Sequence, residues 1–145
     1  MIKIICLGKL KEKYLEDFVN DYLKRISRYH KIEIIELKDT NNLEEEAINI
    51  KKHIDNKDYV ITMEIEGSEY SSIELANLID KTFITSSTIT FIIGSSLGLH
   101  ETIKNRSNLS LSFGKITLPH GIFRSILLEQ IYRAFKINNN EEYHK

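Results

Sequence analysis

The residues best suited to chemistry lie in the last third of this 145-residue chain. The segment Gly94–Gly98, Gly-Ser-Ser-Leu-Gly, directly follows an apolar run that ends at Ile93. In open α/β sheets, ligands bind beyond the carboxyl ends of the strands, where glycine permits close backbone approach and positive φ. The segment is not GxGxxG, and no lysine follows it as in a Walker loop, so a dinucleotide or triphosphate site is disfavoured. Ordinary turn formation is the alternative interpretation.

The chain ends on an aromatic ring, an imidazole and a cation, at Tyr143, His144 and Lys145. An aromatic ring can stack on a nucleic-acid base, and a cation can contact a phosphate. Terminal residues are, however, usually poorly ordered and without a role. The tail is therefore a candidate for nucleic-acid contact, and fraying is the alternative.

The final helix, predicted from Pro119 to about Ile137, contains a cation among apolar residues. Its apolar side chains cover roughly 240° at 100° per residue, which predicts burial by the chain's own sheet and by a second subunit. Arg124 lies within this arc, so it must reach solvent, pair with a carboxylate or face a ligand. Arg133 lies on the opposite side, where it is either solvated or in contact with a phosphate backbone.

Other catalytic patterns are missing from the sequence. No histidine pair has zinc-ligand spacing such as HExxH, there is no cysteine cluster, and no G-x-S-x-G elbow is present. We therefore expect no metal. Cys6 is the single cysteine and lies in an apolar run, which predicts a buried, reduced thiol.

Hydrophobic periodicity alternates between strand-like and helix-like segments along the whole chain. This predicts one α/β domain over residues 1–145, with a mostly parallel sheet flanked by helices on both faces. Ser71 and Glu74 have the spacing of a capping box at a helix start. The expected strands are 2–7, 32–37, 59–65, 88–93 and 116–118, and the expected helices are 12–29, 43–54, 71–83, 100–107 and 119–137.

Composition limits the class of protein further. Hydrophobic residues make up 41% and charged residues 28%, with a formal net charge of −1, as in an ordinary globular protein. No apolar run approaches the about 20 residues that a membrane span needs, so we expect a cytoplasmic protein without membrane contact. Residues 101–145 carry 7 Lys and Arg against 4 Asp and Glu, a basic bias that could meet an anion.

Several motifs in register resemble one bacterial family, the SPOUT-class ribosomal RNA large subunit methyltransferase H. They are Lys3–Tyr14, Gly94–Leu99, Leu111–His120, Glu129–Phe135 and Tyr143–Lys145. The resemblance implies a deep trefoil knot at the C-terminal end, a homodimer, and S-adenosylmethionine bound by the knotted loops. It also implies methylation of N3 of a pseudouridine in large-subunit (23S) ribosomal RNA, which we expect to occur on the assembled ribosome.

The family's functional positions transfer residue by residue. The expected cofactor-binding residues are Met63, Gly94, Phe113, Gly114, Lys115, Ile116, Thr117 and Leu118, and the expected catalytic residues are Tyr143, His144, Lys145, Arg124 and Arg133. His144 is the candidate proton acceptor, in a tail expected to reach the partner's cofactor. Ser95 stands where the family commonly has a second glycine, and Glu142 stands where it has a proline, which could loosen the tail.

Two other functions are compatible with an α/β domain of this kind. A non-catalytic ribosome-associated factor would bind ribosomes without affinity for S-adenosylmethionine. A flavodoxin-like domain would bind a flavin or nucleotide at the glycine segment, although the phosphate fingerprint is missing.

Overall fold

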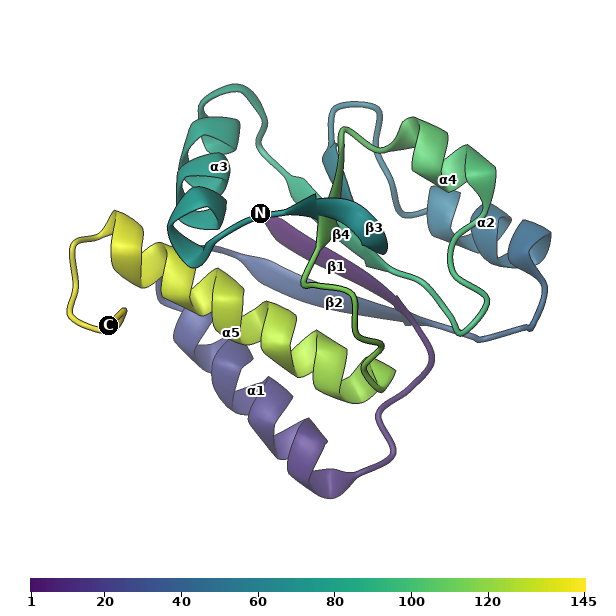
Figure 1. Cartoon of the computed structure of the whole chain (residues 1–145), viewed down its shortest axis with the longest axis horizontal. Helices are drawn as coiled ribbons and strands as arrows, with labels where there is room; N and C mark the ends of the chain where they lie inside the picture. The colour runs from purple at the N-terminus through teal and green to yellow at the C-terminus, as the bar shows by residue number, and fades with distance from the viewer.

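The computed structural model describes residues 1–145 and contains one sheet of five parallel strands in the order β2-β1-β4-β3-β5 (Figure 1). Each strand except β3 is short, and all are joined by helical crossovers, as parallel pairing requires. The strands are β1 (Ile2–Leu7), β2 (Ile32–Leu37), β3 (Tyr59–Glu69), β4 (Ile89–Ile93) and β5 (Leu109–Ser112).

Helices cover both faces of this sheet (Figure 1). On one face, α5 lies between α1 and α3 and packs against both. On the other face, α2 and α4 pack together over a smaller buried cluster. The helices are α1 (Lys13–Ser27), α2 (Leu43–Lys51), α3 (Ser72–Thr85), α4 (Glu101–Arg106) and α5 (His120–Asn138).

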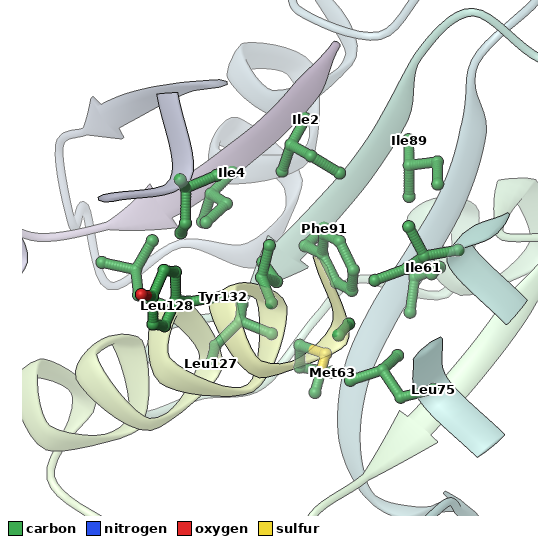
Figure 2. Close-up of a cluster of buried hydrophobic side chains, with 14 of the residues drawn as sticks. Ile2, Ile4, Ile61, Met63, Leu75, Ile89, Phe91, Leu127, Leu128 and Tyr132 are labelled. Atoms are coloured by element: carbon green, nitrogen blue, oxygen red, sulfur yellow. The ribbon is translucent and has the colours of Figure 1, made fainter. Parts of the chain in front are cut away.

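The main core lies between the sheet and α5. Phe91 of β4 is fully buried and packs with side chains from the neighbouring strands and from α5, including Leu127 and Tyr132 (Figure 2). Alternate residues of β1 and β4 serve the second core on the opposite face, where Ile5 and Ile92 meet α2 and α4. Burial on both faces explains why these strands read as continuous apolar runs.

The amino-terminal edge of the sheet is closed by a buried polar cluster. Lys3 Nζ lies 3.2 Å from Asp58 Oδ2, and Thr90 Oγ1 donates to the same oxygen at 3.0 Å. Both members of the ion pair are nearly inaccessible to solvent. Since its charges are satisfied internally, this edge has a structural role.

The structure confirms the parallel α/β architecture and the capping box, in which Glu74 N donates to Ser71 Oγ and Ser71 N to Glu74 Oε1. One predicted element is wrong. The strand expected at 116–118 is not formed, and the fifth strand is instead Leu109–Ser112. Ile116 and Leu118 have strand propensity, but pairing with β3 decides the position, and residues beyond Ser112 have no partner strand.

The third strand is longer than the predicted segment 59–65. It continues to Glu69 after a register irregularity between Met63 and Ser68, and the extension pairs with the end of β5. Gly67 makes this possible, because a Cβ there would lie 2.8 Å from the backbone of Ser110. The trefoil knot expected at the C-terminal end stays a prediction.

Candidate functional site

Three segments predicted to bind a cofactor emerge side by side at the carboxyl edge of the sheet. Met63 is in register with Ile93 of β4 and with Leu111 of β5. The chain after β4 begins at Gly94, directly after Ile93, and the chain after β5 begins at Phe113, two residues beyond Leu111. The Met63 side chain itself points into the core, in the same buried cluster as Leu75 and Leu127 (Figure 2).

The segment Gly94–Gly98 forms a tight loop fixed to α2. A Cβ at Gly94 would lie 2.5 Å from the carbonyl oxygen of Gly98, so only glycine fits there. Ser95 Oγ donates to Glu46 Oε1 at 2.9 Å, and Glu46 is 2% exposed. The serine that departs from the family pattern thus anchors the loop rather than disturbing it.

The loop Phe113–Leu118 presents unpaired backbone groups. Gly114 has a φ of 115°, and none of the N–H groups of Lys115 to Leu118 donates a hydrogen bond within the chain. Ile116 is 73% exposed. Free backbone donors beside apolar side chains suit a flat heteroaromatic ligand with a polar rim, such as adenine.

A pocket of about 610 Å³ opens beside this loop, between the end of β5, the start of α3 and the middle of α5. Phe113 is the one predicted cofactor residue in its lining. The other lining residues were not predicted from the sequence. The predicted third strand ended at residue 65, before the extension of β3 to Glu69 that supplies one wall of the pocket. The other lining residues are Glu69, Tyr70, Ser71, Ser72, Glu74, Leu75, Leu111, Ser112, Ile126 and Gln130.

A carboxylate that sequence analysis did not single out ties three elements together at this edge. Glu64 Oε2 accepts hydrogen bonds from Thr62 Oγ1 at 2.8 Å and Ser110 Oγ at 2.6 Å, and Glu64 Oε1 lies 3.4 Å from Lys104 Nζ of α4. Burial alone would raise the pKa of Glu64, but these hydrogen bonds and the lysine charge outweigh it and lower the pKa. Glu64 thereby fixes the point where β3 changes register.

Arg124 is paired with a carboxylate, which decides between the alternatives left open by the sequence. Its Nη1 lies 2.6 Å from Glu36 Oε2, and its Nη2 donates to the carbonyl of Gly8 at 3.1 Å. His120, one turn earlier, packs its ring against Gly8, and its Nδ1 is buried without a hydrogen-bond partner. Burial and the nearby Arg124 charge lower the pKa of His120.

The other predicted catalytic residues gather against the second half of α5. Arg133 Nη2 lies 2.7 Å from Glu129 Oε1, the Arg133 guanidinium lies 4.8 Å from the centre of the Tyr143 ring, and its Nη1 is 3.1 Å from His144 Nδ1. Tyr143 OH donates to Glu129 Oε1 at 3.1 Å. Lys145 is exposed and makes no such contact.

A single chain therefore does not bring all of its predicted site residues together. Arg124 and the cofactor loops lie at the start of α5, whereas the tail contacts Arg133 further along. From Phe123, against which Phe113 packs, to Glu129, which Tyr143 contacts, α5 rises about 9 Å. The tail and the loops of one chain thus lie at separate positions along the same helix (Figure 1).

Comparisons with known proteins agree with this architecture. The family model described as "Predicted SPOUT methyltransferase" matches residues 1–144. The chain belongs to the SPOUT methyltransferase family. It is 49% identical over 157 aligned residues to the ribosomal RNA large subunit methyltransferase H of Streptococcus uberis, covering 99% of both chains. The corresponding protein of Streptococcus pneumoniae strain CGSP14 is 48% identical, again over 99% of both chains.

Solved structures share the fold of this SPOUT chain at low sequence identity. The tRNA (m1G37) methyltransferase from Aquifex aeolicus superposes with a TM-score of 0.56 at 14% identity, covering 91% of this chain and 69% of that one. The resemblance inferred from the motifs is confirmed, as is the fold class. The functions of the individual site residues stay predictions.

Two further findings describe the whole SPOUT chain. No group of three or more His, Cys, Asp or Glu side chains is arranged to hold a metal ion. No helix has both the length and the apolar character that crossing a membrane requires.

Proposed function

We propose that this SPOUT protein transfers a methyl group from S-adenosylmethionine to N3 of a pseudouridine in large-subunit ribosomal RNA. Near 50% identity along the full length of the ribosomal RNA large subunit methyltransferases H supports this reaction. The structural observation that carries the proposal is the meeting of Met63, Gly94 and the loop Phe113–Leu118 at one edge of the sheet.

The residues at this edge fit S-adenosylmethionine. The free N–H groups of Lys115–Leu118 would hold the polar rim of the adenine, and Ile116 and Leu118 would lie against its apolar faces. When bound, the cofactor supplies an electrophilic methyl group on sulfur. The protein then has to align the displacement and exclude water.

A homodimer would complete the site. Each chain holds its tail against Glu129 and Arg133 of α5, whereas its own loop Phe113–Leu118 leads into the start of that helix. The outward face of α5 carries partly exposed apolar side chains, including Ile122, which is 38% exposed, and Ile126. A second copy packed on this face would cover them and could bring its Tyr143, His144 and Lys145 to the first copy's loops. Most of the wide apolar arc of α5 is already buried within one chain, by the sheet, α1 and α3, so the second copy would cover only this remaining part.

The tail supplies groups that suit methylation of an imide-like nitrogen. N3 must lose its proton before or during attack, so a proton acceptor or a positive field accelerates the reaction. An arginine can only donate, so His144 Nδ1 accepts from Arg133 and neutral His144 carries its proton on Nε2. Seated in this way, His144 donates a hydrogen bond to the developing anion. It acts as a proton acceptor at Nδ1 only after leaving Arg133.

The substrate in this proposal is the assembled ribosome or its large subunit, in the cytoplasm. The chain has a net charge of −1, which gives little electrostatic attraction for naked RNA. Ribosomal RNA shape and neighbouring ribosomal proteins would then supply the docking surface. If a free RNA transcript were methylated as fast as ribosomes are, the assembled ribosome would not be the preferred substrate.

Calorimetric titration with S-adenosylmethionine tests the cofactor, with a flavin and ATP as controls. Micromolar binding of S-adenosylmethionine alone supports the proposal. Absence of binding favours a non-catalytic ribosome-associated factor, and flavin or ATP binding favours a nucleotide-binding domain. Deleting Tyr143–Lys145 tests the tail: cofactor affinity should persist while methyl transfer falls at least ~10²-fold. A fully active truncated protein would remove the tail from the mechanism.

A further inference from the structure

The chain reverses direction after α5 and folds back onto it. Asn140 has a φ of 54°, in the left-handed region, and Glu141 N donates to the carbonyl of Lys136 at 3.0 Å. This turn directs Tyr143 and His144 back toward the middle of α5. A turn alone does not hold a terminal segment of this length in place, because ordering each residue costs about 1–2 kcal/mol of backbone entropy.

A polar anchor holds the turn at Glu141. Its carboxylate accepts a hydrogen bond from Tyr29 OH at 2.9 Å and lies 2.7 Å from Lys136 Nζ. The Tyr29 ring is itself fixed by stacking on Phe135, with ring centres 5.8 Å apart and an interplanar angle of 5°. Hydrogen bonding from Lys136 and Tyr29 lowers the pKa of Glu141, so the carboxylate is charged at neutral pH.

A second anchor holds the tyrosine of the tail. Tyr143 OH lies 3.3 Å from Tyr22 OH of α1 and 3.1 Å from Glu129 Oε1. The Tyr143 ring packs edge-on against Tyr132, with centres 5.0 Å apart. The side chain is thus held by two helices, with Arg133 over its other face.

We propose that Glu141, with Tyr29 and Lys136, is a positioning residue that holds the Tyr143-His144-Lys145 tail ready for methyl transfer. This inference rests on the proposed function. The neighbouring Glu142 is exposed, and neither its carboxylate nor its backbone N–H makes a hydrogen bond or ion pair within the chain. The stiffness that a proline at position 142 would give is therefore replaced here by the contacts of the Glu141 side chain.

The test compares Glu141→Ala with Glu142→Ala, a matched control one residue away that breaks no contact. Each variant is assayed with ribosomes for kcat and KM, by calorimetry for S-adenosylmethionine, and by the rate at which carboxypeptidase removes the tail. We expect Glu141→Ala to lower kcat about tenfold, because fewer tails occupy the competent position. Cofactor affinity should not change, and the tail should be digested faster. Glu142→Ala should behave as the wild type.

A rescue variant separates positioning from a general loss of structure. Proline at Glu142 removes no hydrogen bond and restricts the chain, so Glu141→Ala with Glu142→Pro should recover most of the lost kcat. Tyr29→Phe deletes one hydrogen-bond donor to Glu141, so its kcat should lie between the values of the wild type and Glu141→Ala. Unchanged kcat in Glu141→Ala would overturn the inference, as would an equal effect of Glu142→Ala.

The activities of the wild type, the truncated chain and Glu141→Ala keep this inference separate from the proposed function. If the wild-type protein methylates nothing, the proposed function fails, and the role in positioning for catalysis fails with it. If the protein is active but the truncated chain lacking Tyr143–Lys145 is equally active, the catalytic role of the tail fails alone. If the tail is needed and Glu141→Ala leaves kcat unchanged, the positioning inference fails alone.

Discussion

Arg124 and Glu36 form an ion pair that joins α5 to β2 across 88 positions of sequence, with 2.6 Å between Nη1 and Oε2. The two partners differ in their access to water. The Arg124 side chain is 1% exposed, whereas the Glu36 side chain is 35% exposed. Removing Glu36 leaves a buried arginine, whereas removing Arg124 leaves a partly exposed glutamate. The two substitutions should therefore lower the free energy of unfolding by different amounts.

We predict that Glu36→Ala destabilises the protein more than Arg124→Met does. Glu36→Ala leaves the buried Arg124 guanidinium without its counter-charge, which is unfavourable because an unpaired buried charge is not compensated by water. Arg124→Met leaves a carboxylate that water can reach, and methionine fills much of the vacated volume. Urea titrations of the wild type and the two variants, at one fixed protein concentration, give the free energies of unfolding. Equal losses, or a larger loss for Arg124→Met, would contradict this account of the pair.

Gly94→Ala is predicted to weaken S-adenosylmethionine binding. The added Cβ would lie 2.5 Å from the carbonyl oxygen of Gly98, so the loop must move at the point where it meets the cofactor edge. A shift of this kind should raise the dissociation constant at least about tenfold, which corresponds to about 1.4 kcal/mol. Calorimetry measures this dissociation constant. The control is Ser96→Ala, in the exposed part of the same loop. Unchanged affinity in Gly94→Ala would place the cofactor elsewhere.

The thiol of Cys6 should be unreactive in the folded protein. Burial raises its pKa to about 12, only partly opposed by the positive charge of Arg124. At about pH 8 the thiolate, which is the reactive form, is therefore scarce and shielded. A disulfide reagent should label the denatured protein stoichiometrically and the native protein hardly at all. Rapid labelling of the native protein would contradict the buried position of Cys6 in β1.

His120 should make the protein less stable in mild acid. Burial and the Arg124 charge lower its pKa in the folded state, so near its ordinary pKa the unfolded chain binds a proton that the folded chain does not. Its contribution to stability is thus complete above about pH 6.5 and decreases as the pH falls toward the lowered value.

The variant His120→Asn isolates this effect from His30, whose pKa is also lowered by burial. We expect the melting temperature of the wild type to fall more steeply than that of His120→Asn between about pH 7 and pH 5. Calorimetric scans at a fixed protein concentration measure both slopes. Parallel slopes would show that His120 takes up its proton equally in both states.

Much of the fold could be predicted because local and global signals agree. Ile2–Leu7 reads as a buried strand and is buried on both faces, and Ser71 and Glu74 form the capping box that their spacing predicts. The fifth strand was misplaced, because the β-branched Ile116 and Thr117 favour a strand more than Leu109–Ser112 does, and pairing with β3 overrides that propensity.

The candidate site could be predicted only in part. The glycines at positions 94 and 114 mark loops that need unusual backbone geometry, and they do lie at the carboxyl edge. The pairing of Arg124 with Glu36, however, joins residues that no sequence spacing relates. The same holds for Tyr29 and Glu141, 112 positions apart, whose contact depends on how α1 packs against α5.

The central claim, methylation of a pseudouridine in large-subunit ribosomal RNA, is tested most directly by mass mapping of the RNA product. Ribosomes that lack the modification are incubated with the purified protein and S-adenosylmethionine, and their RNA is digested and sequenced by mass. The account predicts one added methyl group, on N3 of a single pseudouridine of the large-subunit RNA. A methyl group on another RNA or another atom, or no methyl group despite cofactor binding, would contradict it.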